Sequence, residues 1–187
     1  MQWLTERLVI DALQRDDAEA LFGYRADPEV SRYQGWKPTS VDEALRFIET
    51  CEALAPDTPG TWFQRAIRWR GAATLIGDIG LHFLADAQST VELGISLSPQ
   101  HQGQGLAIEA LNAVLSVVFG DLHKHRVIGS IDPRNHASAK LLASLGMRRE
   151  AHFRESLLVD NAWVDDVIYA MLDREWLARQ TAGHHRG

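Results

Sequence analysis

The chain has 187 residues, a formal net charge of −6 and a single cysteine, Cys51. The single cysteine excludes an internal disulfide and a cysteine-rich metal site, and the acidic balance argues against a nucleic-acid-binding protein. No apolar run approaches the roughly 20 residues of a membrane span, and residues 1–7 lack the pattern of a signal peptide. We therefore expect one cytoplasmic domain over residues 1–187, with a frayed tail over 180–187.

The first half of the sequence predicts a strand, two helices and two further strands. In chain order these are a strand over 7–13, helices over 18–25 and 40–54, and strands over 61–70 and 73–83. The segment from Ser40 to Glu43 has the pattern of a capping box, which marks the start of the second helix. Gly71 is expected at the turn between the two strands.

The second half alternates strands with helices before it ends in two strands. In chain order these are a strand over 91–97, a helix over 105–119, a strand over 126–132, a helix over 135–145, and strands over 148–159 and 163–172. Strand 91–97 alternates most regularly, which places Glu92 on the face opposite the apolar side chains. Strands in runs, with helices between some of them, indicate an α/β (α+β) fold with a mixed sheet.

A glycine-containing loop joins strand 91–97 to the long helix. It includes Gly103 and Gly105, where the absence of a side chain allows a ligand to approach the backbone closely. Free amide groups at a helix start bind phosphate, so the loop is a candidate phosphate site. The lysine of a nucleotide-binding P-loop is missing, and the dinucleotide-binding pattern of glycines is not matched. Two glycines alone are equally consistent with a tight turn that binds nothing.

The pattern Gln100-x-x-Gly103-x-Gly105 resembles the pyrophosphate-binding motif of the GNAT superfamily of N-acetyltransferases. Further segments resemble this family at matching spacing: Val91 to Ile95, Glu109-Ala110, Asn135-x-x-Ser138, Leu145-Gly146-Met147 and Trp163-x-Asp165-x-x-x-Tyr169. Residues 5–8 are similar to the start of the RimJ/RimL-type branch, which acetylates ribosomal-protein N-termini. The resemblance implies a mostly antiparallel mixed sheet of about seven strands with helices on both faces.

The resemblance also implies acetyl-CoA as cosubstrate and a set of residues that hold it. The implied cofactor-binding residues are Ile95, Ser96, Leu97, Gln102, Gly103, Gln104, Gly105, Leu106, Ala107, Asn135 and Ser138. In this family the strand that carries Ile95 diverges from its neighbour and leaves N–H groups unpaired. One of these groups can stabilise the oxyanion that forms when an amine attacks the thioester.

Two residues are candidates for acid–base catalysis. Glu92 is the candidate base, because it lies on the cofactor strand away from the apolar face. The alternative is an ordinary surface carboxylate. Many GNAT enzymes have a tyrosine acid where this sequence has Leu142, and leucine cannot donate a proton. Ser138 is the candidate acid, as in the RimL-like branch. The alternative is a serine that only bonds the first turn of its helix.

The acceptor side of the sequence is less distinctive. Trp36 and His82 are candidate substrate-binding residues, although Trp36 is equally consistent with the core. No histidine pair has the spacing of a zinc motif, so we expect no metal. The expected partner is an amine acceptor, for example the N-terminus of a ribosomal or other protein, bound by a monomer or homodimer. The alternatives are a small amine (an aminoglycoside, polyamine or amino acid) and a non-catalytic acyl-CoA-binding module.

Overall fold

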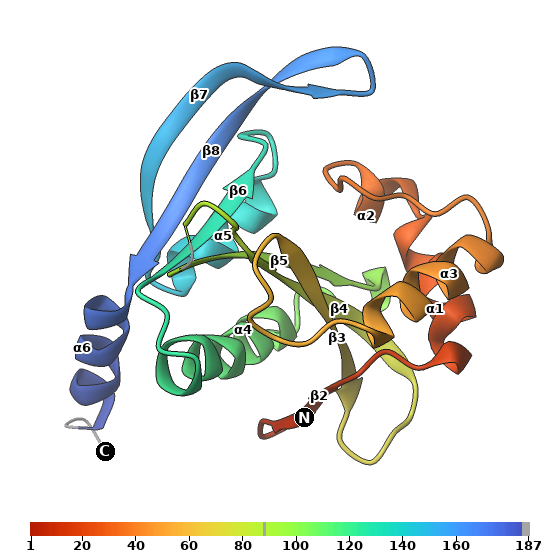
Figure 1. Ribbon diagram of the computed structural model, residues 1–187, viewed down its shortest axis with the longest axis horizontal. Helices are drawn as coiled ribbons and strands as arrows, with labels where there is room; N and C mark the ends of the chain where they lie inside the picture. The colour runs from red at the N-terminus through yellow and green to blue at the C-terminus, as the bar shows by residue number, and fades with distance from the viewer. Residues whose placement is uncertain (88, 185–187) are drawn as a thin grey trace.

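The computed structural model describes residues 1–87 and 89–184, and it is built around one mixed sheet of eight strands (Figure 1). The strand order is β1-β2-β3-β4-β5-β6-β8-β7. The strands are β1 (Trp3–Leu4), β2 (Leu8–Asp11), β3 (Thr61–Trp69), β4 (Leu75–Phe83), β5 (Thr90–Leu97), β6 (Arg126–Ile131), β7 (Arg148–Val159) and β8 (Ala162–Leu172). Neighbouring strands pair antiparallel except β5 and β6, which are parallel. This confirms the predicted mixed, mostly antiparallel sheet, and the short β1 makes it eight strands.

The helices lie between and after these strands. They are α1 (Ala18–Arg25), α2 (Pro28–Ser31), α3 (Val41–Glu52), α4 (Leu106–Ser116), α5 (His136–Ser144) and α6 (Asp173–His184). The Ser40 hydroxyl accepts a hydrogen bond from the Glu43 N–H at 3.2 Å, so the predicted cap does start α3. Asp27 caps the short α2 in the same way, by accepting from the Glu29 N–H at 2.8 Å.

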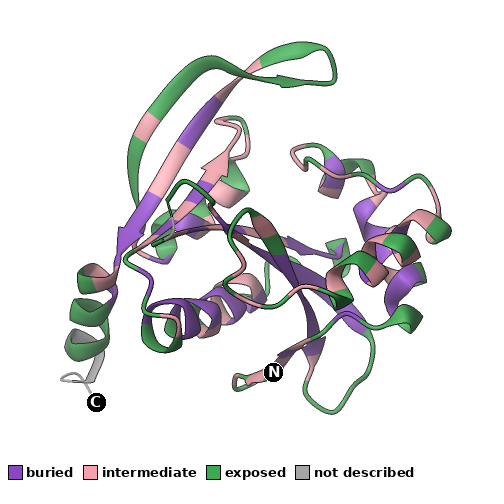
Figure 2. Cartoon of the chain, viewed as in Figure 1, coloured by how far each residue is buried: buried purple, intermediate pink, exposed green. Residues whose placement is uncertain are grey.

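Helices cover both faces of the sheet. Successive strand residues point to opposite sides, so each strand contributes side chains to both packed faces. In β3, Ile67 belongs to a core that includes residues of α4 and α5, such as Leu111 and Leu142. Its neighbour Ala66 belongs to a second core, formed with residues of α1 and α3 such as Leu21. We call the side that carries Ala66 the α1-side face. Buried residues are concentrated in this central part of the molecule, as Figure 2 shows.

The C-terminal part of the chain differs from the prediction at its end. The β7–β8 hairpin projects from the sheet, and β7 is largely exposed (Figure 2). The prediction that two strands close the chain is wrong, because α6 follows them. Its Glu175 carboxylate accepts a hydrogen bond from the Leu172 N–H at 2.8 Å, and the buried Trp176 packs near Phe119. Of the predicted frayed tail, residues 180–184 are helical and 185–187 lie outside the described residues.

Within the described residues, no helix is both long and apolar enough to span a membrane. The same residues contain no group of three or more histidine, cysteine, aspartate or glutamate side chains arranged to hold a metal ion.

Candidate active site

The parallel strands β5 and β6 are paired over only part of their length. Their paired positions are Thr90–Arg126, Val91–Val127 and Glu92–Ile128. Beyond Glu92 the two strands diverge, while β5 stays paired with β4 on its other edge as far as Leu97. Backbone N–H and C=O groups require hydrogen-bond partners, so the diverging edge of β5 presents such groups to a ligand. The opening between the two strands thus lies along β5, the strand that was expected to diverge from its neighbour.

The glycine-containing loop follows β5 directly and leads into α4. Gly103 and Gly105 have φ angles of 72° and 78°, a left-handed conformation that favours glycine. The Gln102 side-chain amide donates to the Leu97 carbonyl at 3.0 Å, and the Gln104 amide donates to the Gln100 carbonyl at 2.8 Å. These bonds hold the loop while the first amides of α4 remain available. The helix start is therefore suited to an anion.

A cavity of about 550 Å³ lies at this opening. Its size is within the range of small-molecule sites. Its lining comes from four parts of the chain: Glu29, Val30, Tyr33 and Gln34; Ile95, Ser96 and Leu97; Gln102, Gly103 and Gly105 to Ile108; and Asn135, Ala137, Ser138, Lys140, Leu141 and Ser144. All the predicted cofactor-binding residues except Gln104 lie along it. Because α4 and α5 cover one face and α2 the other, the cavity crosses the sheet where β5 and β6 diverge.

The Ser96 side chain gives an independent indication of a ligand in this cavity. Its hydroxyl is buried and has no hydrogen-bond partner within the described part of the chain, although the residue lines the cavity. A buried polar atom without a partner is unfavourable, so it is expected to bond something that enters. An extended ligand with amides and phosphates, such as coenzyme A, fits both this hydroxyl and the helix start.

α5 contributes the two other predicted cofactor residues. The Asn135 side-chain oxygen accepts a hydrogen bond from the Ser138 N–H at 3.0 Å, so Asn135 caps the helix. Ser138 is half-buried and lines the cavity. Leu142, at the position of the family's tyrosine, is buried and points at Gly129, where an added Cβ would lie 2.8 Å from a Leu142 methyl group. It therefore serves packing.

Glu92 and His82 face each other on the α1-side face. They are cross-strand partners, and Nδ1 of His82 lies 3.3 Å from Oε2 of Glu92. Both side chains keep about a quarter of their surface exposed. Neither residue lines the large cavity, but Glu92 is the last position of β5 paired with β6, so it lies where the strands begin to diverge.

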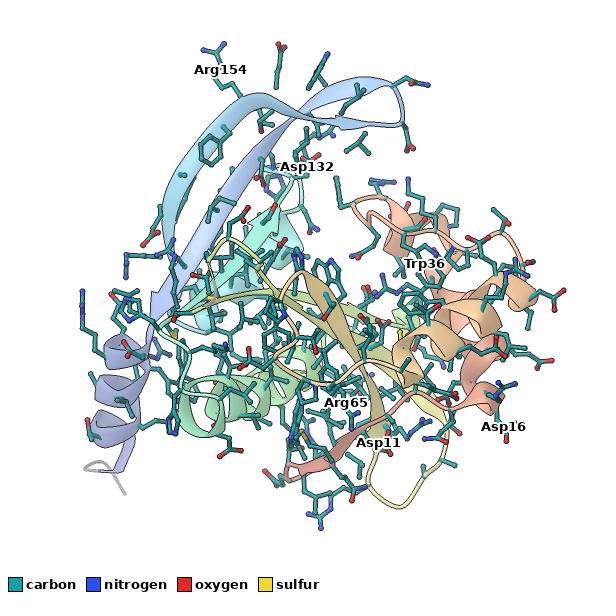
Figure 3. The ribbon with its side chains drawn as sticks, in the orientation of Figure 1. Asp11, Asp16, Trp36, Arg65, Asp132 and Arg154 are labelled. Carbon is teal, nitrogen blue, oxygen red and sulfur yellow. The ribbon has the colours of Figure 1, made fainter. Side chains whose placement is uncertain are left out.

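Trp36 and Asp78 belong to the supporting structure around the site. Trp36 stacks on Phe47 with ring centroids 4.1 Å apart, beside the helices of the α1-side core (Figure 3). Asp78 has no exposed surface and accepts hydrogen bonds from Tyr24 at 2.6 Å and from Nε of Arg25 at 3.0 Å. Arg25 in turn donates to Gln34 of the cavity lining at 3.2 Å. The partly buried indole thus packs against the α1-side core, and the buried carboxylate holds α1 against the sheet.

Comparison with known proteins agrees with this geometry. Residues 7–148 match the acetyltransferase (GNAT) domain family, which is most of the chain. The chain belongs to the GNAT family. Its relatives include the Bacillus subtilis N-acetyltransferase YoaA, which is 31% identical over 173 residues covering 90% of this chain and 94% of YoaA. This GNAT protein is therefore an N-acetyltransferase.

Two of the further relatives are named for different acceptors. The Escherichia coli ribosomal protein uS5-alanine N-acetyltransferase is 37% identical over 84 residues, or 45% of this chain and 43% of that one. A GNAT acetyltransferase structure from Bacillus anthracis superimposes with a TM-score of 0.83 at 27% identity, covering 94% of this chain and 100% of that chain. The Vibrio cholerae spermidine N-acetyltransferase, solved with CoA and spermine, gives 0.76 at 22% identity over 91% and 98%. The acceptor is thus left open.

Two segments that resemble the family, residues 5–8 and Glu109-Ala110, contact each other in this GNAT protein. Glu109 of α4 accepts hydrogen bonds from the Thr5 hydroxyl, the Arg7 N–H at 2.8 Å and the Arg7 guanidinium at 2.6 Å. Arg7 also donates to the Gln104 carbonyl in the loop at 3.2 Å. Glu109 therefore anchors the start of the chain beside the glycine-containing loop. Sequence spacing alone did not reveal this role, because the partners are about a hundred residues apart.

Proposed function

We propose that this N-acetyltransferase transfers the acetyl group of acetyl-CoA to the α-amine at the N-terminus of a protein or peptide. The choice of acceptor rests on the carboxylates of the α1-side face. Asp78 is buried and paired with Arg25, and Glu29 of the cavity lining is paired with Arg32. Of the carboxylates on β4 and β5, Glu92 is therefore the one that no arginine or lysine neutralises in the part of the chain that the structure describes. A single carboxylate suits a single ammonium group, whereas a polyamine carries several. The partial likeness to the uS5-alanine enzyme supports the same choice.

The chain's own residues would hold the donor in two places. The first amides of α4 and the backbone at Gly103 and Gly105 suit the pyrophosphate. The diverging edge of β5 and the Ser96 hydroxyl suit the amide-bearing arm. Acetyl-CoA supplies an acetyl thioester, whose carbonyl is the electrophile for the amine. An unpaired N–H of β5 aimed at that carbonyl would stabilise the negative charge that develops during attack.

Glu92 is the proposed base, acting directly or through a water. An α-ammonium group has a pKa of about 7.7–8.0, so an appreciable fraction is already neutral near pH 7. Glu92 therefore needs only to take the proton that the nitrogen loses as the new C–N bond forms and the C–S bond breaks. Ser138, on the cavity wall, is the proposed donor to the leaving sulfur, and a water would resupply the proton that its hydroxyl passes on. Because a thiol has a pKa of about 8.5, this donation helps the reaction without being essential.

The test is release of free thiol from acetyl-CoA with a panel of acceptors: peptide N-termini, lysine peptides, polyamines and aminoglycosides. We expect turnover with peptide N-termini, and Glu92→Gln to lower kcat/KM by about 100-fold or more. Ser138→Ala should lower kcat by less. Glu150→Gln, on exposed β7, is the control and should leave the rate unchanged. Turnover with polyamines alone would replace the proposed acceptor, and an unaffected Glu92→Gln enzyme would remove the proposed base.

A further inference from the structure

Three side chains form a continuous row across β3, β4 and β5 on the α1-side face. Trp62 is the cross-strand partner of His82, and His82 is the partner of Glu92. The Trp62 and His82 rings are stacked, with centroids 4.8 Å apart and planes 12° from parallel. His82 then contacts the Glu92 carboxylate through Nδ1 at 3.3 Å. The row therefore places an indole, an imidazole and the proposed base side by side.

This row lies at the uncovered end of the face. Further along the same face, toward α1, Gln64 of β3 and Asp78 of β4 are buried, and the helix covers the sheet there. Trp62, in contrast, keeps 42% of its surface exposed, although a large aromatic residue is usually buried. This exposure shows that the neighbouring elements leave part of the indole uncovered at that end of the face.

Two glycines leave space for the indole beside the divergence of β5 and β6. Gly80 of β4 and Gly94 of β5 are cross-strand partners in the next row. A Cβ at Gly80 would be 2.8 Å from a ring carbon of Trp62, which no real side chain could occupy unless the ring moved. A Cβ at Gly94 would be 3.6 Å from the same ring. The indole thus extends over Gly80 toward Gly94, which lies two residues beyond Glu92.

We propose that Trp62, together with His82 and Glu92, forms the subsite for the amine-bearing end of the acceptor. The subsite takes a primary amine on an uncharged carbon stem: the ammonium group faces Glu92 and the stem packs on the exposed indole. The negative face of an indole favours a nearby cation, and its surface favours apolar groups. His82 is a positioning residue, because it contacts the indole on one side and the carboxylate on the other. This inference rests on the proposed function, since it takes Glu92 as the base.

The subsite also predicts a preference among peptide acceptors. A first residue with an apolar side chain can pack on Trp62 next to its own amine. An acidic first residue would bring a like charge close to Glu92, which is unfavourable. We therefore expect peptides that begin with leucine to have a lower KM than otherwise identical peptides that begin with aspartate. Loss of the indole should reduce this difference.

The experiment compares the kinetics of Trp62→Ala, Trp62→Phe and Trp163→Ala with those of the wild type. Trp163→Ala is the matched control, because Trp163 on the hairpin is 62% exposed and far along the sheet from β3. For the best acceptor, Trp62→Ala should raise KM by about tenfold and change kcat by less than threefold. Trp62→Phe should keep most of the wild-type KM. The Kd of coenzyme A, measured by calorimetry, should be unchanged in all three variants. An unchanged Kd would show that each variant is folded.

The possible results distinguish failure of the Trp62 subsite from failure of the proposed peptide acceptor. An acceptor KM for Trp62→Ala within twofold of wild type, or equal to that of Trp163→Ala, would overturn the subsite while leaving the activity in place. If the wild type acetylates only polyamines, the proposed peptide function fails. The subsite is then overturned as well, because the stem of a polyamine carries several charges. If a single-amine small molecule is the acceptor, the peptide function fails but the tenfold KM effect of Trp62→Ala still supports the subsite.

Discussion

Asp78 and Glu92 are carboxylates on the same sheet face, yet their surroundings give them different roles. Asp78 has no exposed surface and is bonded by Tyr24 and Arg25, whereas Glu92 keeps contact with solvent and faces His82. Burial raises the pKa of Tyr24 well above its usual value, and the neighbouring Asp78 charge raises it further. The tyrosine therefore stays a hydrogen-bond donor to Asp78. The network is structural, which is why we propose Glu92 and not Asp78 as the base.

This difference predicts a large loss of stability when the buried pair is broken. Arg25→Met leaves the Asp78 carboxylate buried without its cation, which should lower the free energy of unfolding by about 3–5 kcal/mol. The measurement is urea unfolding followed by circular dichroism. The control is Arg15→Met, because Arg15 pairs with Glu49 on the surface and should contribute less than about 1 kcal/mol. Arg25→Met combined with Asp78→Leu should recover part of the loss, and a small effect of Arg25→Met alone would contradict this interpretation.

At the scale of elements, the loop between β5 and α4 depends on backbone conformation more than on side chains. An added Cβ at Gly103 would meet no protein atom within 4 Å, although the residue lines the cavity. A side chain there would extend into space that a ligand needs. The left-handed φ of 72° adds strain for any other residue. Both effects make glycine the residue that fits this position.

The loop therefore predicts a binding defect that differs from a simple loss of stability. Gly103→Ala should weaken coenzyme A binding by about tenfold, which corresponds to roughly 1.4 kcal/mol. Gly71→Ala is the control: Gly71 has a φ of 79° and also open space, but it lies in the β3–β4 turn, outside the cavity lining. Both variants should lose similar stability, and calorimetry should detect weaker binding in Gly103→Ala alone. Equal Kd values for the two would show that the loop does not contact the cosubstrate.

Over the whole molecule, the site depends on segments that are distant in sequence. The cavity draws its lining from α2, β5, α4 and α5. Lys37, after α2, forms a 2.9 Å ion pair with Asp160 at the tip of the β7–β8 hairpin, and the Tyr33 hydroxyl donates to the Arg134 carbonyl at 3.4 Å. Glu109 similarly joins α4 to Thr5 and Arg7. These contacts connect segments from the first forty residues of the chain with segments after residue 100.

The Glu109 anchor predicts a pH-dependent contribution to stability. Burial alone would raise the pKa of Glu109, but hydrogen bonds from Thr5 and Arg7 lower it below its ordinary value. A carboxyl with a lowered folded-state pKa stabilises the fold above its unfolded pKa of about 4.3, and this stabilisation is lost as pH falls through the folded value. Glu109→Gln should therefore lower the free energy of unfolding at pH 7 by about 1–3 kcal/mol.

The measurement is urea unfolding from pH 7 down to about pH 3. The difference between wild type and Glu109→Gln should shrink as the pH falls below about 4. Glu6→Gln is the control, because Glu6 is exposed in the same segment of the chain. A difference that stays constant with pH would mean that the charge of Glu109 does not contribute.

The sequence by itself determined most of the elements and the place of the glycine-containing loop. Period-two alternation defined β5, an N-cap serine marked the start of α3, and two glycines marked the loop, because each of these depends on residues close in the chain. α6 was missed, since its start depends on Trp176 packing against the core. Only the tertiary structure decided that Trp62, His82 and Glu92 form one row and that Leu142 packs on Gly129. Strand register and burial arise from contacts between distant residues, and no local pattern encodes them.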